Sequence, residues 1–296
     1  MLLLLFLLVH GQPADHRAKM KVDGIERSYI IHLPGSFGTK RSRALVIALH
    51  GGYGQASGMQ ALTGLSDVSD REGFLVAYPD GIDRHWNDGR ETIRNDVDDV
   101  AFISALIDRL IAQYRIDPKR IYATGISNGG FFSLRLACDL PEKIAAVACV
   151  AASMSETKST QCHPSDPVSV LFIDGTADPI VPYGGGEVRH RGRMGFGGRI
   201  LSAPDSAAWW AEKNGCVKIP KTESLPDRDP RDGTTITRTT YAGGRSGTEV
   251  QLLAIRNGGH TWPGGSQYLP AFLIGRTSRD IKASETIWNF FKDRSR

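Results

Sequence analysis

The sequence predicts an α/β fold in which a mostly parallel central sheet is covered by helices on both faces. Short, uninterrupted apolar runs, which are typical of strands buried on both sides, alternate with segments of helical periodicity. Several of these apolar runs end in turns rich in glycine, aspartate or proline. The 296 residues contain no repeat and no convincing linker. We therefore expect residues 15–296 to form a single domain.

The predicted elements follow one another in a regular order. Alternating residues at 26–33 predict an antiparallel edge strand, and residues 184–198, rich in glycine and arginine, predict a mobile loop. Apolar and β-prone runs predict strands at residues 44–49, 74–78, 120–124, 145–150, 168–173, 234–241 and 250–255. Helical patterns predict helices at residues 96–114, 131–137, 204–214 and 283–292.

The N-terminal segment is strongly apolar from Met1 to Val9. It is too short to span a bilayer, and it resembles the core of a secretory signal peptide without its basic front. We expect residues 1–14 to be a truncated signal segment. The protein is then exported to the extracellular or periplasmic space, without stable membrane insertion.

Charge and motif content exclude several classes of function. The net charge is only +4, and no dense basic run is interleaved with aromatic residues, so nucleic-acid binding is not expected. No phosphate loop or dinucleotide fingerprint is present, and His85 and Asp88 lack a third ligand at metal-binding spacing. We expect no cofactor, no metal site, and a monomer or dimer.

Four cysteines are present, at positions 138, 149, 162 and 216. An even number in an exported protein permits one or two disulfides, but their pairing does not follow from sequence. Cys149 lies in an apolar run, where a buried free thiol is the simplest interpretation.

A tight turn centred on Ser127 lies between a predicted strand and a predicted helix. Its residues, Gly125 to Gly129, follow the pattern Gly-x-Ser-x-Gly, which is typical of a nucleophile elbow in this setting. The glycines leave room for a turn that side chains would block. The following helix directs free N–H groups and its positive dipole end at the same point. The pattern predicts that Ser127 is a nucleophile.

Two downstream residues qualify as partners of Ser127. A serine hydroxyl needs a base, the base needs an orienting acid, and after an elbow the chain order is serine, acid, histidine. Asp178 follows the strand predicted at 168–173, and Asp174, nearer the strand end, is its rival. Asp178 is favoured because the Asp-Pro turn can hold a carboxylate over the strand ends. His260 is the expected base, because it follows the last predicted core strand.

A glycine loop after the strand predicted at 44–49 is suited to form an oxyanion hole. Glycine lets backbone N–H groups approach the developing negative charge closely. The expected donors are the N–H of Asn128 and an N–H from Gly52 or Tyr53. His50, the first residue of the loop, is expected to brace it beside the substrate.

Together these motifs resemble one family, the α/β-hydrolase esterases grouped with polyhydroxybutyrate depolymerases and feruloyl esterases, similar to carbohydrate esterase family 1. The matching segments span nearly the whole chain and are jointly specific. They are Leu49 to Gly51, Tyr78 to Gly81, Val97 to Phe102, Gly125 to Gly130, Gly175 to Tyr183 and Gly258 to Gly264.

The resemblance implies an α/β-hydrolase fold, secretion, a carboxylic ester substrate, and Ser127, Asp178 and His260 as the catalytic triad. The sequence departs from the family in two places. Relatives often carry a cysteine near Gly244, so Cys216 is left either unpaired or bonded to Cys162, and a Cys138–Cys162 bridge is another possibility. The family also often has histidine where Asp174 stands.

The resulting hypothesis is a secreted serine esterase. Feruloyl or other hydroxycinnamoyl esters of plant cell-wall polysaccharide are the first expected substrates, a short hydroxyalkanoate polyester the second and acetylated xylan the third. Substrate contacts are expected from His50, Tyr53, Trp86, Tyr183 and Trp262. Alternatives from other classes are a non-catalytic binding protein of the same fold, which would need no intact triad, and a peptidase, whose relatives usually carry an extra domain.

Overall fold

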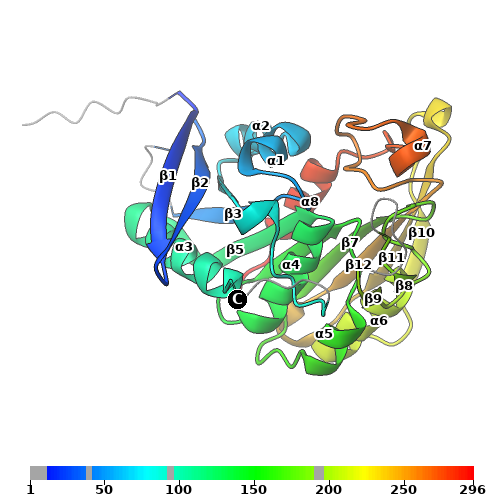
Figure 1. Ribbon diagram of the computed structural model, residues 1–296. Helices are drawn as coiled ribbons and strands as arrows, with labels where there is room; N and C mark the ends of the chain where they lie inside the picture. The colour runs from blue at the N-terminus through cyan, green and yellow to red at the C-terminus, as the bar shows by residue number, and fades with distance from the viewer. Residues whose placement is uncertain (1–11, 38–41, 92–96, 190–196) are drawn as a thin grey trace, which may run out of the picture.

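The computed structural model describes residues 12–37, 42–91, 97–189 and 197–296, which are built around one ten-stranded sheet (Figure 1). In the order in which they lie side by side, its strands are β1 (Ala14–Val22), β2 (Ile25–Leu33), β4 (Leu75–Pro79), β3 (Arg43–Leu49), β5 (Ile116–Ile126), β6 (Ala146–Val150), β7 (Ser169–Gly175), β12 (Val250–Arg256), β11 (Thr235–Tyr241) and β10 (Lys221–Ser224).

The centre of this sheet is parallel and both of its edges are antiparallel. Strands β4, β3, β5, β6, β7 and β12 pair in parallel, whereas β1, β2, β11 and β10 join through antiparallel pairs. The fold is the α/β-hydrolase type expected from the sequence. Because parallel strands end at a common edge, the loops that follow them meet there.

The expected edge strand lies one position further in. Strand β2 pairs with β4 on one side and with β1 on the other, so β1 is the edge. No strand was predicted at β1, where the apolar alternation is short: Ala18, Met20 and Val22 pack half-buried against the core between exposed lysines. Ala14, assigned to the signal segment, is the first residue of this strand.

Helices cover both faces of the sheet (Figure 1). One face packs against α3 (Asp99–Gln113), α4 (Asn128–Asp139) and α6 (Ala203–Asn214), and the other against α1 (Ala56–Thr63), α2 (Leu65–Glu72) and α8 (Ala283–Phe291). Two apolar cores result, one on each side. Shorter elements complete the described chain: α5 (Glu156–Gln161), α7 (Ala271–Ile274), the pair β8 (Gly186–Glu187) and β9 (Arg199–Ile200), and three 3-10 turns, η1 (Ile82–Arg84), η2 (Pro230–Asp232) and η3 (Arg245–Gly247). Strand β8 lies within the predicted 184–198 loop and β9 directly follows it, whereas residues 190–196 lie outside the described chain.

Helix α3 begins later than its apolar pattern predicts. The Asp98 side chain accepts a hydrogen bond from the backbone N–H of Ala101 and caps the helix, so the first helical residue is Asp99. The buried Asp99 carboxylate forms an ion pair with Arg27 at 2.6 Å and accepts from the backbone N–H of Asn87 at 2.7 Å. The start of α3 therefore anchors the loop that follows β4.

One disulfide joins Cys138, near the end of α4, to Cys162, directly after α5. This pairing is one of the two that the sequence left open. Cys149 is a buried free thiol, as expected, and Cys216 is also unpaired. The bridge closes a segment with a sequence separation of 24 and ties α5 to the helix that follows Ser127.

Removing this bridge should lower the melting temperature. Closing a loop of this length stabilises a fold by about 3 kcal/mol, which corresponds to roughly 6 °C for a domain of this size. We expect the double variant Cys138→Ala, Cys162→Ala to melt lower than wild type by about this amount in a thermal scan without reductant. Cys216→Ala is the matched control. Equal melting temperatures for the double variant and wild type would contradict the prediction.

Candidate active site

Ser127 occupies a strained turn between β5 and α4. Its backbone has φ 55° and ψ −123°, a conformation that few non-glycine residues adopt. A Cβ atom at Gly125 would lie 2.4 Å from the carbonyl carbon of Gly129, and a Cβ at Gly129 would lie 2.2 Å from the carbonyl oxygen of Leu49. Only glycine fits at both positions, so the local geometry is that of the predicted elbow.

The first turn of α4 is aimed at the same place. Asn128 is the first residue of this helix, and its backbone N–H has no partner within the helix. Its side chain is fixed by three hydrogen bonds: Oδ1 accepts from the N–H of Trp86, and Nδ2 donates to the carbonyl of Trp86 and to Asp88 Oδ2. The backbone N–H of Asn128 is thereby held in a constant position beside Ser127.

A buried ion pair between Arg90 and Asp88 supports the Asn128 side chain. Arg90 donates from Nε and Nη2 to the carboxylate of Asp88, at distances down to 2.7 Å. The same guanidinium lies 4.1 Å from the centre of the Phe131 ring and donates to the carbonyl of Gly197. In the sequence, Asp88 stood out only beside His85, as a metal ligand that lacks the partners it would need. Its structural role could not be inferred without knowing that Arg90 lies against it in the interior.

Asp178 and His260 are brought into direct contact by the loops after β7 and β12. His260 Nδ1 lies 2.8 Å from Asp178 Oδ2, and both residues are buried. Asp178 Oδ1 accepts from the backbone N–H groups of Ile180 and Val181 at 2.7 and 2.9 Å. A carboxylate only accepts, so Nδ1 carries the proton and the neutral ring has its lone pair on Nε2.

The two loops pack closely enough to require glycine. A Cβ at Gly175 would lie 2.3 Å from the carbonyl oxygen of Gly258. The backbone of His260 is held by its own N–H, which donates to Ile274 at 2.6 Å, and by its carbonyl, which accepts from the Tyr268 hydroxyl at 2.7 Å. The imidazole is therefore fixed from several sides. Ser127 Oγ makes no hydrogen bond to His260 in this conformation, within the described part of the chain.

Asp174, the rival acid, does not contact His260. Its Oδ1 accepts from the backbone N–H of Ala152 at 3.0 Å, and its buried Oδ2 has no partner among the described residues. Burial raises the pKa of this carboxyl well above its usual range, and the neighbouring Asp178 raises it further. Asp174 is therefore a buried carboxyl beside the site whose neutral form is favoured by burial.

Asp174→Asn should change how stability depends on pH. Because the pKa of Asp174 is raised in the folded protein, the neutral acid favours folding at low pH, and this contribution is lost as pH rises above the unfolded value of about 3.9. Asparagine cannot ionise. We expect the melting temperature of wild type to fall relative to that of the variant as the pH is raised from about 4 to 8. A constant difference across that range would show that Asp174 does not titrate this way.

The glycine loop after β3 lies against Ser127 and Asn128. A Cβ at Gly51 would lie 3.6 Å from that of Ser127, and one at Gly52 would lie 3.9 Å from that of Asn128. The backbone N–H of Tyr53 is already bonded to the carbonyl of Arg84 at 2.9 Å, so the expectation that it could serve the oxyanion hole is wrong. The N–H of Gly52 has no partner among the described residues and remains the candidate donor.

His50 braces this loop and does not face a substrate. Its Nε2 accepts from the backbone N–H of Gly81 at 3.0 Å, so Nδ1 is the donor to the carbonyl of Gly51 at 2.8 Å. Burial lowers the pKa of His50, which favours the neutral ring that this arrangement needs. Both ring nitrogens are bonded to backbone groups, so the predicted substrate contact is wrong. These two bonds are the ones that a residue bracing the loop would make.

Two of the predicted aromatic contacts are also wrong. The Trp86 ring is 0% exposed, stacks on Phe132 and donates from Nε1 to the carbonyl of His50 at 3.0 Å. The Trp262 ring is 1% exposed and donates to Ser284 at 3.1 Å. Both rings are core residues beneath the site. Tyr53 is 57% exposed and Tyr183 is half-buried, so these two stay predictions.

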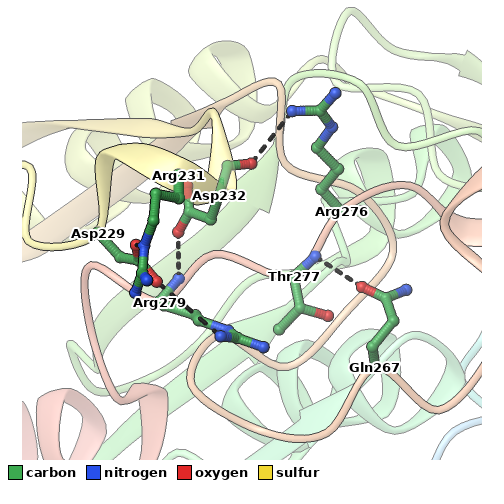
Figure 2. A pocket seen from close by; sticks show the side chains of 7 residues that line it. All are labelled: Asp229, Arg231, Asp232, Gln267, Arg276, Thr277 and Arg279. Carbon is green, nitrogen blue, oxygen red and sulfur yellow. Dashed lines mark hydrogen bonds and ion pairs between the residues drawn. The ribbon is translucent and has the colours of Figure 1, made fainter.

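A separate polar pocket of about 380 Å³ lies among the loops near α7 (Figure 2). It is lined by Asp229, Arg231, Asp232, Gln267, Arg276, Thr277 and Arg279. Figure 2 shows Arg231 and Arg279 directed at Asp229, with which both form ion pairs. Its charges largely neutralise one another, and none of the three predicted catalytic residues lines it, so we assign it no substrate.

Two further features of the described ranges concern membranes and metals. No helix there has the length and apolar character needed to cross a membrane. No group of three or more histidine, cysteine, aspartate or glutamate side chains in those ranges is placed to hold a metal ion.

Comparison with known proteins identifies relatives of this sequence. A family model described as Esterase PHB depolymerase matches residues 27–179. NocK of Nocardia uniformis subsp. tsuyamanensis, by its name an esterase, is 34% identical over 278 residues, which cover 91% of this chain and 80% of that protein. Feruloyl esterase B of Piromyces equi is 30% identical over 242 residues, which cover 79% of this chain but only 42% of the relative.

A solved structure supports the same fold. The acetyl xylan esterase from Aspergillus awamori matches with a TM-score of 0.65, over 94% of this chain and 99% of the other. Its sequence identity is 14%, so this likeness shows the fold alone.

Proposed function

This chain belongs to the PHB depolymerase family of esterases and hydrolyses carboxylic esters, and we propose that it does so through an acyl-enzyme formed on Ser127. In this proposal Ser127 Oγ attacks the ester carbonyl while His260 Nε2 takes its proton. His260 then passes that proton to the leaving alcohol. A water molecule, activated by the same nitrogen, hydrolyses the acyl-enzyme and releases the acid.

The observation that carries this mechanism is the contact between Asp178 and His260. One carboxylate oxygen holds the imidazole, and the other is held by two backbone N–H groups. The ring therefore has one fixed tautomer, with the basic nitrogen directed away from the carboxylate. This is the state in which histidine can accept a proton from a serine.

The negative oxygen of the transition state would be stabilised by the backbone N–H groups of Asn128 and Gly52. Asn128 lies at the start of α4, where the helix dipole adds to the effect. Its side-chain bonds to the loop after β4 prevent the N–H from turning away. Preorganised donors of this kind lower the barrier by about 3 kcal/mol each.

We propose hydroxycinnamoyl esters of plant cell-wall polysaccharide as the first substrate class. The support is the name of the Piromyces relative, a feruloyl esterase. Short hydroxyalkanoate polyesters are second, in line with the description of the family model, and acetylated xylan is third. Secretion is part of the proposal, and the Cys138–Cys162 disulfide supports it because such bonds persist mainly in oxidising compartments.

Two assays on the purified protein test these proposals. A fluorophosphonate probe should label wild type and fail to label Ser127→Ala. A protein that binds esters without turnover and is not labelled would favour the non-catalytic alternative. Parallel hydrolysis of methyl ferulate, hydroxybutyrate oligomers and acetylxylan, with a dipeptide amide as the peptidase control, then ranks the substrates. A preference for the polyester or the acetylated xylan would overturn the first substrate class but leave the mechanism intact.

A further inference from the structure

Two loops meet at the edge of the candidate oxyanion hole. The loop after β3 carries Tyr53, and the loop after β4 carries His85. The backbone N–H of Tyr53 donates to the carbonyl of Arg84 at 2.9 Å, and the rings of Tyr53 and His85 meet edge to face with their centres 4.5 Å apart. Tyr53 is 57% exposed, so part of its side chain lies at the surface next to the histidine.

The His85 ring offers a hydrogen-bond acceptor at this point. Its Nδ1 lies 3.0 Å from the carbonyl oxygen of Asp83, which can only accept, so Nδ1 carries the proton. The neutral ring then has a lone pair on Nε2, for which the described residues supply no partner. This Nε2 lies 3.2 Å from the position that a Cβ would take on Gly52, so it borders the residue whose N–H is the candidate oxyanion donor.

The backbone around this ring is held in unusual conformations. Tyr53, Asp83 and Arg84 all have left-handed φ angles, between 49° and 62°. Such conformations are costly for non-glycine residues, persist only where the surroundings enforce them, and cluster at functional sites. Here the Tyr53–Arg84 hydrogen bond and the bond from His85 to Asp83 fix the position of the imidazole.

We propose that His85 and Tyr53 form a subsite for a hydroxyl-bearing part of the ester substrate. The substrate hydroxyl donates to His85 Nε2 while the adjoining carbon skeleton lies on the Tyr53 ring. This inference rests on the proposed function, since it describes the substrate of that same site. The hydroxyl has two possible sources, the alcohol part of the ester or its acyl part, and both present the same chemistry to the histidine.

Matched ester pairs test this subsite. For the alcohol part the pair is a 2-hydroxyethyl and a 2-methoxyethyl ester of one acid, and for the acyl part it is methyl ferulate and its dimethoxy analogue. In each pair a methyl ether replaces the hydroxyl, which removes the donated proton and adds one methyl group, so the His85 variants are needed to assign the effect to the hydrogen bond. Wild type should prefer the hydroxyl member of one pair by about fivefold in kcat/KM, as expected for one net hydrogen bond. The pair that shows the preference identifies the source.

His85→Phe should abolish that preference, because phenylalanine keeps a ring against Tyr53 but has no acceptor. We expect kcat/KM to fall on the hydroxyl ester and to stay the same on the ether, with the change mainly in KM. His85→Gln, which retains an acceptor, should restore part of the preference. His163→Phe, at an exposed histidine in the loop after α5, is the matched control and should behave as wild type.

Three results would overturn the subsite. Wild type could show no preference in either pair, His85→Phe could keep the preference, or it could lose activity equally on both members of a pair. Equal labelling of wild type and His85→Phe by a fluorophosphonate confirms that the variant is folded. If wild type hydrolyses p-nitrophenyl acetate but shows no preference, only the subsite is overturned. If it hydrolyses no ester at all, the proposed function is overturned together with the subsite.

Discussion

Ser127→Ala should lower kcat for ester hydrolysis by about 10⁵- to 10⁶-fold, the loss typical of removing a serine nucleophile. Ser127 carries the hydroxyl at the strained turn between β5 and α4, directly before the first residue of the helix. Alanine removes the hydroxyl and leaves the packing of the turn unchanged. Hydrolysis of a p-nitrophenyl ester, followed spectrophotometrically, measures the effect.

Ser133→Ala is the matched control for this experiment. Ser133 lies in the same helix, is buried, and donates to the carbonyl of Gly129 at 2.9 Å. The substitution therefore costs about 1 kcal/mol of stability for one hydrogen bond and leaves the reacting groups in place. If Ser127→Ala kept most of the activity of wild type, the acyl-enzyme mechanism would be wrong.

The parallel core of the fold could be predicted from sequence because its strands are apolar on both faces. Strands β3, β4, β6 and β7 coincide with the predicted runs within one or two residues. The antiparallel edges were harder to predict. In β1 the apolar alternation is confined to its second half, and β10, with the mostly exposed sequence Lys-Thr-Glu-Ser, has no hydrophobic pattern that would distinguish it from a loop.

The catalytic motifs of the site could be predicted from sequence more accurately than the residues that line it. Tight turns impose glycine at fixed spacing, so the elbow and the histidine loop leave a signature that can be recognised without coordinates. The burial of an aromatic ring leaves no such signature. Trp86 and Trp262 stand next to functional motifs in sequence, yet both rings turn into the core and support the site from beneath.

Tertiary contacts also decide what a polar residue does. The Tyr53 N–H cannot serve the oxyanion hole because the carbonyl of Arg84, about thirty residues away in the chain, already accepts it. The Asp88–Arg90 pair is local in sequence, but its function follows from Asn128 Nδ2, which donates to Asp88 at 2.7 Å. Neither interaction has a sequence pattern that could have predicted it.

Asp178→Asn should lower kcat by about 10⁴-fold, the loss seen when the acid of such a triad becomes an amide. The structure supplies the reason. Asp178 Oδ1 accepts from the N–H groups of Ile180 and Val181, so in the variant this position keeps the amide oxygen. The NH₂ group must then face His260 Nδ1, where a carboxylate oxygen lay at 2.8 Å. An amide that donates to Nδ1 forces the proton onto Nε2, and the histidine can no longer accept a proton from Ser127.

Asp174→Asn makes the same chemical change on a neighbouring buried carboxyl that does not contact His260, and it should retain most of the activity. Because burial favours the neutral form of Asp174, comparing the two variants separates the loss of the tautomer from the effect of placing an amide at a buried carboxyl position near the site. Asp178→Asn should leave KM close to that of wild type and slow fluorophosphonate labelling in parallel with kcat, because both reactions need Ser127 deprotonated by His260. If Asp174→Asn were the more damaging of the two, or if Asp178→Asn kept more than about a tenth of the wild-type rate, His260 would not depend on Asp178 for its tautomer.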